Sequence, residues 1–409
     1  MVRRRTIGFE ARGSAASTHT PYFDGWQNGA TVTTARPRTG SYGLQAVSNG
    51  IAQDTILQLR TAEILTGNGD ASFIRVYFNT TSITPSANST IILLANPAGA
   101  TFASIRLKTT GELQLLNSSS TQIGSDSAAL VADTWYRIEI SFTLNTGGND
   151  TVSARIDGVE FASGAPTGPS NTEVIGRVRL GWVSAAAAGI TLYFDDFAWN
   201  DSSGTTQNSW PGEGKIVLLT PTSDNQVGDW TGGAGGVTNL WEALNNAPPV
   251  GTATETNTSQ IENATNGGGT DYIANLTDYS TAGLTASDTI NVVQAFVDTG
   301  EDAAANTKTG QFKLASNPAG NFTAFTFADD NGALGTWPNG WRCMWSESVD
   351  APSVTLGTSP TIELDNTTAS TDVVSVDSMG AYVDYQESEA SVGGGLLISP
   401  RLQSQRLRR

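Results

Sequence analysis

Residues 190–201, with the sequence ITLYFDDFAWND, constrain the fold more than any other segment of the chain. Apolar and polar side chains alternate on both sides of a change of phase, which predicts a half-buried strand. The apolar positions are Leu192, Phe194, Phe197 and Trp199. Two adjacent carboxylates, Asp195 and Asp196, interrupt the alternation. Successive strand residues point to opposite faces, so this pair needs either separate roles or a bulge.

The rest of the chain predicts an all-β protein. Only 15% of the 409 residues are charged, 44 are glycine, and Ser, Thr and Asn are abundant, a composition typical of turn-rich antiparallel sheets. Asp157-Gly158 separates two strand-like segments and is the strongest hairpin signal, because a type I′ turn needs positive φ at both central residues. One short helix is expected at residues 238–244. The length favours two domains.

Four segments occur in an informative order: RPRTGSYGLQA (36–46), TWYRIEISF (134–142), TVSARIDGVEF (151–161) and LYFDDFAWND (192–201). Together they resemble a concanavalin A-like, laminin-G-like jelly roll over residues 5–205. The resemblance implies that the last strand closes a sheet beside the first, TIGFE, and that the Trp-Tyr-Arg strand faces the Asp-Gly hairpin. An immunoglobulin-like sandwich is the alternative fold, but the chain lacks the Cys-Trp-Cys pattern that would support it.

The charge distribution divides the chain. The net charge is +1 over residues 1–179, −22 over residues 180–400 and +4 over residues 401–409. We expect a basic N-terminal arm and first strand (1–12), the jelly roll (5–205), a linker (206–215), a second, acidic β-sandwich (216–395) and a basic C-terminal arm (396–409). Asn-Pro-Ala-Gly precedes an alternating strand in both halves, at Asn96 and Asn317, which leaves open duplication of one sandwich or a chance turn.

Catalytic signals are weak, and the chain is expected not to be an enzyme. A glycosidase on this scaffold needs two facing carboxylates, whereas the strand at 134–142 offers only Glu139. His19 is the only histidine and Cys343 the only cysteine, so neither a histidine-rich metal site nor a disulfide can form within the chain. No phosphate-binding loop occurs.

Asp195, Asp196 and Asp201 are the candidate metal ligands. Carboxylates at this place in a jelly roll could hold calcium with further oxygens from neighbouring residues. The alternative is structural: one carboxylate caps a turn or accepts hydrogen bonds while the other is solvated. No other cofactor is expected.

Exposed tryptophans are the candidates for stacking on sugar rings, because their faces are broad and apolar. Four were considered as glycan-binding residues: Trp182, Trp199, Trp337 and Trp341. Burial in a sandwich core or a subunit interface is the competing fate of each.

Two clusters of arginines lie at the ends of the chain, and we expect them to form assembly arms that dock on acidic protein surfaces. They are Arg3, Arg4 and Arg5 at the start, and Arg401, Arg406, Arg408 and Arg409 at the end. The acidic body argues against nucleic acid as a partner. Neither a signal peptide nor a membrane span is apparent, so synthesis in the cytoplasm without a membrane partner is expected.

The opening MVRRRTIGFE, the jelly roll and the continuation SWPGEGKIVLLTPTSDNQVGDW resemble minor tail and capsid-decorating proteins of tailed bacteriophages. The resemblance implies a non-enzymatic structural component of the virion that binds other capsid or tail proteins and forms homo-oligomers. The alternative function is a lectin-like module of the virion that recognises a host-surface glycan.

Overall fold

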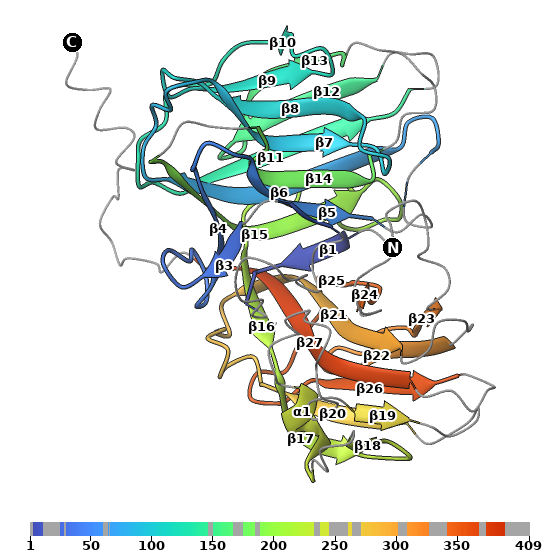
Figure 1. Ribbon diagram of the computed structural model, residues 1–409. Helices are drawn as coiled ribbons and strands as arrows, with labels where there is room; N and C mark the ends of the chain where they lie inside the picture. Colours follow the sequence, from blue (N-terminus) through green and yellow to red (C-terminus); the bar gives the residue numbers. More distant parts are fainter. Residues whose placement is uncertain are drawn as a thin grey trace.

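The structure is a computed structural model. It describes residues 3–10, 25–27, 30–59, 64, 66–145, 150–166, 175–184, 189–232, 238–244, 261–263, 271–301, 309–326, 342–367 and 374–388. Over these residues the chain is all-β, as the sequence predicts, with four antiparallel sheets stacked in pairs as two sandwiches (Figure 1). One helix of five residues, α1 (Leu240–Leu244), lies within the predicted helical segment. In the described part of the chain no helix is long and apolar enough to cross a membrane.

The first sandwich is formed by sheets A and B, whose strands lie between Arg3 and Asp201. Sheet A has the order β13 (Val159–Gly164), β12 (Thr151–Ile156), β11 (Tyr136–Thr143), β6 (Ala71–Thr80), β15 (Thr191–Asp201), β4 (Gly43–Val47) and β3 (Thr31–Thr33), with β1 (Arg3–Ile7) also paired to β15. Sheet B has the order β10 (Gln122–Ile123), β9 (Leu113–Asn117), β8 (Thr101–Leu107), β7 (Ser89–Ala95), β14 (Arg177–Trp182), β5 (Gln53–Gln58) and β2 (Gly25–Gln27).

The second sandwich is formed by sheets C and D, whose strands begin at Lys215. Sheet C has the order β18 (Thr231–Gly232), β19 (Ile261–Asn263), β27 (Val374–Gln386), β21 (Thr289–Glu301) and β24 (Arg342–Trp345); β16 (Lys215–Leu219) pairs with β27 and β25 (Val349–Asp350) with β21. Sheet D has the order β17 (Pro221–Gln226), β20 (Tyr272–Leu276), β26 (Thr361–Asn366), β22 (Thr309–Ser316) and β23 (Thr323–Thr326).

Alternation along the strands explains the core of the first sandwich. In β11, Ile138, Ile140 and Phe142 are buried in the apolar cluster between sheets A and B, while the intervening Glu139 belongs to the opposite face. The same period places Ile74, Val76 and Phe78 of β6 in that cluster. Residues such as Arg75 and Tyr77 therefore lie on the other side of sheet A, called here the outer face of sheet A.

The pairings that the resemblance implies in the first sandwich are confirmed. Strand β15 lies beside β1, with Phe197 opposite Ile7, and β11 pairs with β12 along its length. Asp157 and Gly158 both have positive φ, 51° and 82°, as a type I′ turn between β12 and β13 requires. The sequence pattern therefore identified the concanavalin A-like sandwich correctly.

Both Asn-Pro-Ala-Gly motifs lie in the connections of antiparallel hairpins. Asn96 follows β7 and precedes β8, and Asn317 follows β22 and precedes β23. The shared sequence thus marks a shared turn position, and duplication of a sandwich stays a prediction.

Candidate functional site

A bulge in β15 separates the strand into two halves with different neighbours. The register with β6 shifts between Asp195 and Ala198, and Asp196 has φ of 49°. Before the bulge, β15 pairs with β4 as far as Phe194. After it, Phe197 begins the pairing with β1. The interruption in the sequence pattern is therefore the point at which sheet A changes partner strands.

The paired aspartates hold the loop between β3 and β4. The Oδ2 atom of Asp195 accepts hydrogen bonds from the backbone N–H groups of Arg38 (2.8 Å) and Thr39 (3.1 Å). The carboxylate of Asp196 pairs with the Arg38 guanidinium and accepts a hydrogen bond from Thr39 Oγ1 (2.9 Å). Its other oxygen accepts from the N–H of Ile216 (2.7 Å), the second residue of β16. Asp196 therefore also ties the two sandwiches together.

Burial dominates the electrostatics of this pair. It raises the pKa of Asp195 well above its ordinary value, and the charge of Asp196 adds to the rise. Burial also raises the pKa of Asp196, although the guanidinium groups of Arg38 and Arg75 oppose that effect.

Hydrogen-bond donors of the protein, three backbone N–H groups and the Thr39 hydroxyl among them, surround the Asp195 and Asp196 carboxylates. Asp201 is turned to different partners: it pairs with Arg4 and accepts a hydrogen bond from the N–H of Ser203 (2.8 Å). Among the described residues, no group of three or more His, Cys, Asp or Glu side chains is placed to hold a metal ion. The contacts therefore do not fit a calcium site shared by Asp195, Asp196 and Asp201, and calcium binding stays an untested prediction.

The expectation of an N-terminal arginine arm is wrong for Arg3, Arg4 and Arg5. These residues form the start of β1, and all three are buried. Arg3 Nη1 lies 2.6 Å from Asp384 Oδ2 of β27, and the Arg5 guanidinium lies over the ring of Trp345 at 5.7 Å. Arg3 and Arg4 do pair with carboxylates, but these belong to the same chain: Asp384 of the second sandwich and Asp201 of the first. Arg401, Arg406, Arg408 and Arg409 lie outside the described residues.

The prediction that four tryptophans stack on sugars is wrong for two of them. Trp182 and Trp199 have no exposed surface and belong to the core of the first sandwich, so neither face is open to a ligand. Their alternating positions in strands explain this outcome, because both share the inward face with other apolar residues. Trp337 and Trp341 lie outside the described residues.

The segment predicted to be a linker, 206–215, is packed across the outer face of sheet A. Trp210 lies edge-on to Phe73 of β6 (5.7 Å between ring centroids) and under the guanidinium of Arg155 (3.9 Å). The N–H of Gly212 donates to Glu139 Oε1 (2.8 Å). Trp210 was not among the predicted packing residues, although a lone tryptophan within a Ser- and Gly-rich segment indicates that the segment packs against the protein.

Glu139 serves as a structural acceptor. It is almost fully buried, forms an ion pair with Arg137 (3.2 Å), and its neighbours across the strands are Arg75 and Arg155. Its cross-strand neighbours are thus cations, and Glu139 is held by ion pairing and by the N–H group of Gly212.

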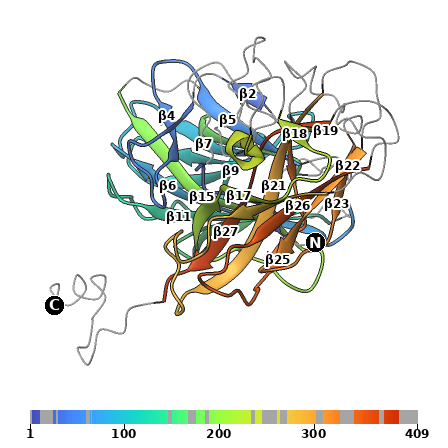
Figure 2. The same cartoon turned by 90° about the horizontal axis from the view of Figure 1, so that it is seen from below.

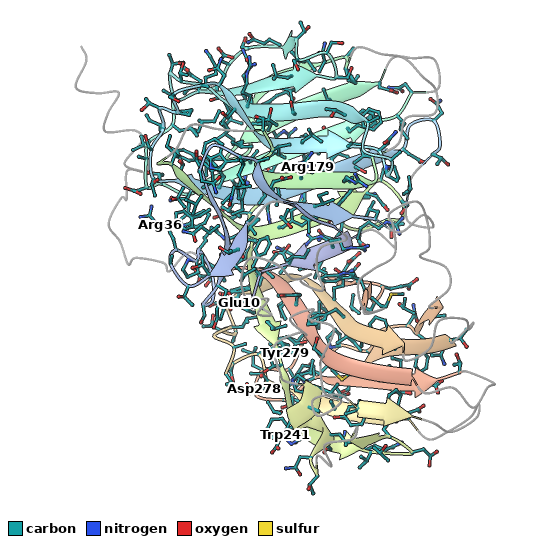
Figure 3. The ribbon with its side chains drawn as sticks, viewed as in Figure 1. Glu10, Arg36, Arg179, Trp241, Asp278 and Tyr279 are labelled. Atoms are coloured by element: carbon teal, nitrogen blue, oxygen red, sulfur yellow. The ribbon has the colours of Figure 1, made fainter. Side chains whose placement is uncertain are left out.

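A second group of polar residues remains partly open on the outer face of sheet A, and we call it the Arg36 cluster. It consists of Arg36, Gln45, Asn79, Asp133 and Tyr193. Gln45, Tyr193 and Asn79 form one row across β4, β15 and β6, because Tyr193 is the register partner of both others. Figure 3 shows Arg36 beside β3 at the margin of the first sandwich.

Contacts within the Arg36 cluster fix the guanidinium. It lies 5.3 Å from the centre of the Tyr193 ring, donates to Asn79 Oδ1 (3.0 Å) and pairs with the Asp133 carboxylate. Gln45 Nε2 donates to the Tyr193 hydroxyl (3.2 Å). The exposed fraction of the side chain is 33% for Arg36 and 60% for Asp133, whereas Asn79 and Tyr193 are buried beneath them. The cluster therefore presents one oriented cation and one exposed anion to solvent.

Neither a protein-family model nor a curated protein matches the chain. Among solved structures, the chain is similar to cellulose-induced protein Cip1 (15% identity, 47% of this chain and 89% of that chain, TM-score 0.32). It is also similar to an endo-β-1,4-glucuronan lyase from the fungus Trichoderma reesei (12% identity, 46% and 95%, TM-score 0.32). A Trypanosoma rangeli sialidase in complex with sialic acid has 13% identity, with 48% and 30% of the two chains covered and a TM-score of 0.33.

These similarities correct one expectation drawn from the sequence. The chain was expected not to be an enzyme, but two of these three structures carry the names of enzymes, a lyase and a sialidase. The expectation is therefore contradicted. At this level of similarity, neither the activity nor the ligand of those proteins passes to this chain.

Proposed function

We propose that the chain is a glycan-binding protein whose binding site is the Arg36 cluster. The observation that carries this proposal is the fixed guanidinium of Arg36, held over Tyr193 and beside Asn79 and paired with the exposed carboxylate of Asp133. Small polar ligands are recognised by a few polar groups with set orientations, because groups that are already ordered lose little conformational entropy on binding. Arg36 meets that condition.

The chemistry of the cluster favours a glycan that carries a carboxylate. Asp133 is the most exposed member of the cluster, and an exposed ion pair contributes little to stability, so exchanging its carboxylate for one from a ligand costs little. Arginine binds carboxylates through two parallel hydrogen bonds, which supplies both affinity and orientation. Once Asp133 is displaced, its own oxygens become acceptors for sugar hydroxyls.

An array of neutral and carboxylate-bearing oligosaccharides tests the proposal with three proteins: wild type, Arg36→Gln and Arg106→Gln. Arg106 is the matched control, since it lies on the outward side of β8 in sheet B and binds Gln114. We expect wild type and Arg106→Gln to bind the same acidic glycans, and Arg36→Gln to bind them at least about tenfold more weakly, the value of one charge-assisted hydrogen bond. Binding that survives Arg36→Gln unchanged, or no binding by wild type, would overturn the proposal.

A second candidate is a structural role in a bacteriophage particle, with other virion proteins and further copies of the chain as partners. The buried contacts between the two sandwiches support this candidate, because a rigid tandem can act as a spacer in a symmetric assembly. The basic residues 401–409 are the proposed contact with an acidic neighbour. Deleting them should abolish incorporation into particles and leave the melting temperature of the isolated protein unchanged. Normal incorporation of the shortened chain would exclude this use of the C-terminus.

A further inference from the structure

Strand β1 lies at the junction of the two sandwiches (Figure 1), and Figure 2 shows β21 and β27 of the second sandwich from below. On one side its backbone pairs with β15, from Arg3 opposite Asn200 to Ile7 opposite Phe197. Its other side faces β21, where Gln294 Nε2 donates to the carbonyl oxygens of Arg3 (3.4 Å) and Arg4 (3.2 Å). The backbone of β1 is therefore bound by both sandwiches at once.

A buried ion network also joins β1 to both sandwiches, through β6 of the first and β27 of the second. The carboxylate of Asp384 in β27 forms ion pairs with Arg3 Nη1 of β1 (2.6 Å) and Arg75 Nη2 of β6 (3.2 Å). None of the three side chains is exposed. The remaining donors of Arg3 reach Asn200 and Gln207. Removing Arg3 would take one of two guanidinium partners from the buried Asp384 carboxylate and leave Arg75 as the other.

Apolar contacts complete the junction. Ile7 and the nearby Phe9 belong to the same apolar cluster as Phe296, Trp345 and Tyr382 of sheet C. Of the three aromatic rings of sheet C, Tyr382 stacks on both others, with centroids 5.6 Å from Phe296 and 6.1 Å from Trp345. An aromatic surface of this kind becomes a site of aggregation or binding when it is exposed, so it has to be covered by neighbouring residues such as Ile7 and Phe9.

We propose that β1 is a latch that makes one cooperative unit of the two sandwiches. With β1 in place the sandwiches unfold together. When β1 dissociates from the junction, the two sandwiches reorient and unfold independently of each other. The aromatic rings of Phe296, Trp345 and Tyr382 then become accessible to solvent. The latch belongs to the fold and does not depend on what the Arg36 cluster binds.

The first experiment removes the latch from the whole chain. A variant lacking residues 2–7 should show two calorimetric transitions where wild type shows one, and a larger maximum dimension in solution scattering. A synthetic peptide of residues 1–10, added in excess, should restore the single transition, as strand addition to an open sheet edge predicts. One unchanged transition, with unchanged dimensions, in the shortened chain would overturn the proposal.

The second experiment keeps the proposal testable if the shortened chain does not fold. Arg3→Met and Asp384→Leu should each lower the melting temperature and split the transition. The two losses should not add in the double variant, because Asp384→Leu already removes the partner of Arg3, and recovery should stay incomplete because Arg75 loses the same carboxylate. Lys215→Met with Glu387→Leu is the matched control, a partly exposed ion pair within the second sandwich (2.5 Å), and should leave one transition. Equal cooperativity in the Arg3 and Lys215 variants would contradict a latch at β1.

Discussion

Arg3 and Asp384 are 381 positions apart in the chain, and their side chains form an ion pair with no exposed surface. The pair joins the first strand of one sandwich to the last strand of the other. Arg75 from β6 approaches the same carboxylate, so two cations share one anion inside the protein. Such an arrangement holds only while the carboxylate is ionised, because otherwise both guanidinium groups lose their counter-charge.

Acid should therefore weaken the junction between the two sandwiches. Burial alone would raise the pKa of Asp384, but the guanidinium groups of Arg75 and Arg3 outweigh it and hold the pKa below its ordinary value of 3.8. A carboxyl group with a lowered pKa stabilises the fold above its unfolded-state pKa, and this contribution is lost as the pH falls further. We expect the free energy of unfolding of wild type, measured by urea titration, to decline steeply below about pH 4.

The Asp384→Asn variant tests that origin. It should be less stable at neutral pH by about 3–5 kcal/mol, the cost of leaving a buried partner unpaired, and its acid decline should be shallower. Glu387→Gln, which breaks a half-exposed pair, should change stability by less than about 1 kcal/mol. An acid decline of the same depth in Asp384→Asn and wild type would assign it to other carboxylates.

The fold was predictable where short-range rules determine it. Alternation located β11 and β15, and Asp157-Gly158 located the hairpin, because strand period and turn geometry depend on a few consecutive residues. The beginning of the chain was not predictable in that way. The sequence predicted a solvated arm at Arg3, Arg4 and Arg5. A run of cations is stable in the interior only beside carboxylates, and here the carboxylates lie about 200 and 380 positions away in the sequence.

The candidate site shows the same division. The strand pattern marked Asp195 and Asp196 as unusual, but their donors come from the loop at Arg38 and Thr39, which only the folded sheet brings near. Trp182 and Trp199 were predicted to bind sugars because tryptophan rings can stack on sugar rings, but both side chains point into the core and are fully buried. Arg36 carried no local signal, because its row of neighbours is assembled from three strands.

Close backbone approach at Gly181 should make it intolerant of substitution. Its φ is 123°, and a Cβ there would lie 2.3 Å from the carbonyl oxygen of Gln53 on β5. We expect Gly181→Ala to cost at least about 2 kcal/mol in chemical denaturation, from backbone strain and steric overlap together. Gly50→Ala is the control, because Gly50 also has positive φ (88°) but has open space around it, and should cost about 1 kcal/mol. Equal costs would show that strain alone decides.

Chelation decides between the structural and the calcium interpretations of Asp195 and Asp196. Their oxygens already accept hydrogen bonds from N–H and hydroxyl groups, so we expect the melting temperature to be the same with calcium and with excess EGTA. Asp196→Ala should lower it in both buffers, since it removes contacts to the loop and to β16. A melting temperature that rises with calcium in wild type, and not in Asp196→Ala, would establish a metal site.

Asp271, just before β20, should titrate far from an ordinary aspartate. Partial burial and a hydrogen bond to the side chain of Glu363 raise its pKa to about 6, with Asp365 adding to the rise and Lys313 opposing it. Carbon-detected NMR titration of the carboxyl groups should find a pKa near that value for Asp271. Because its pKa is raised, Asp271 stabilises the fold at low pH and loses this contribution as the pH rises through about 6. Glu363→Gln should lower the pKa of Asp271 and Lys313→Met should raise it, and opposite shifts would contradict this assignment.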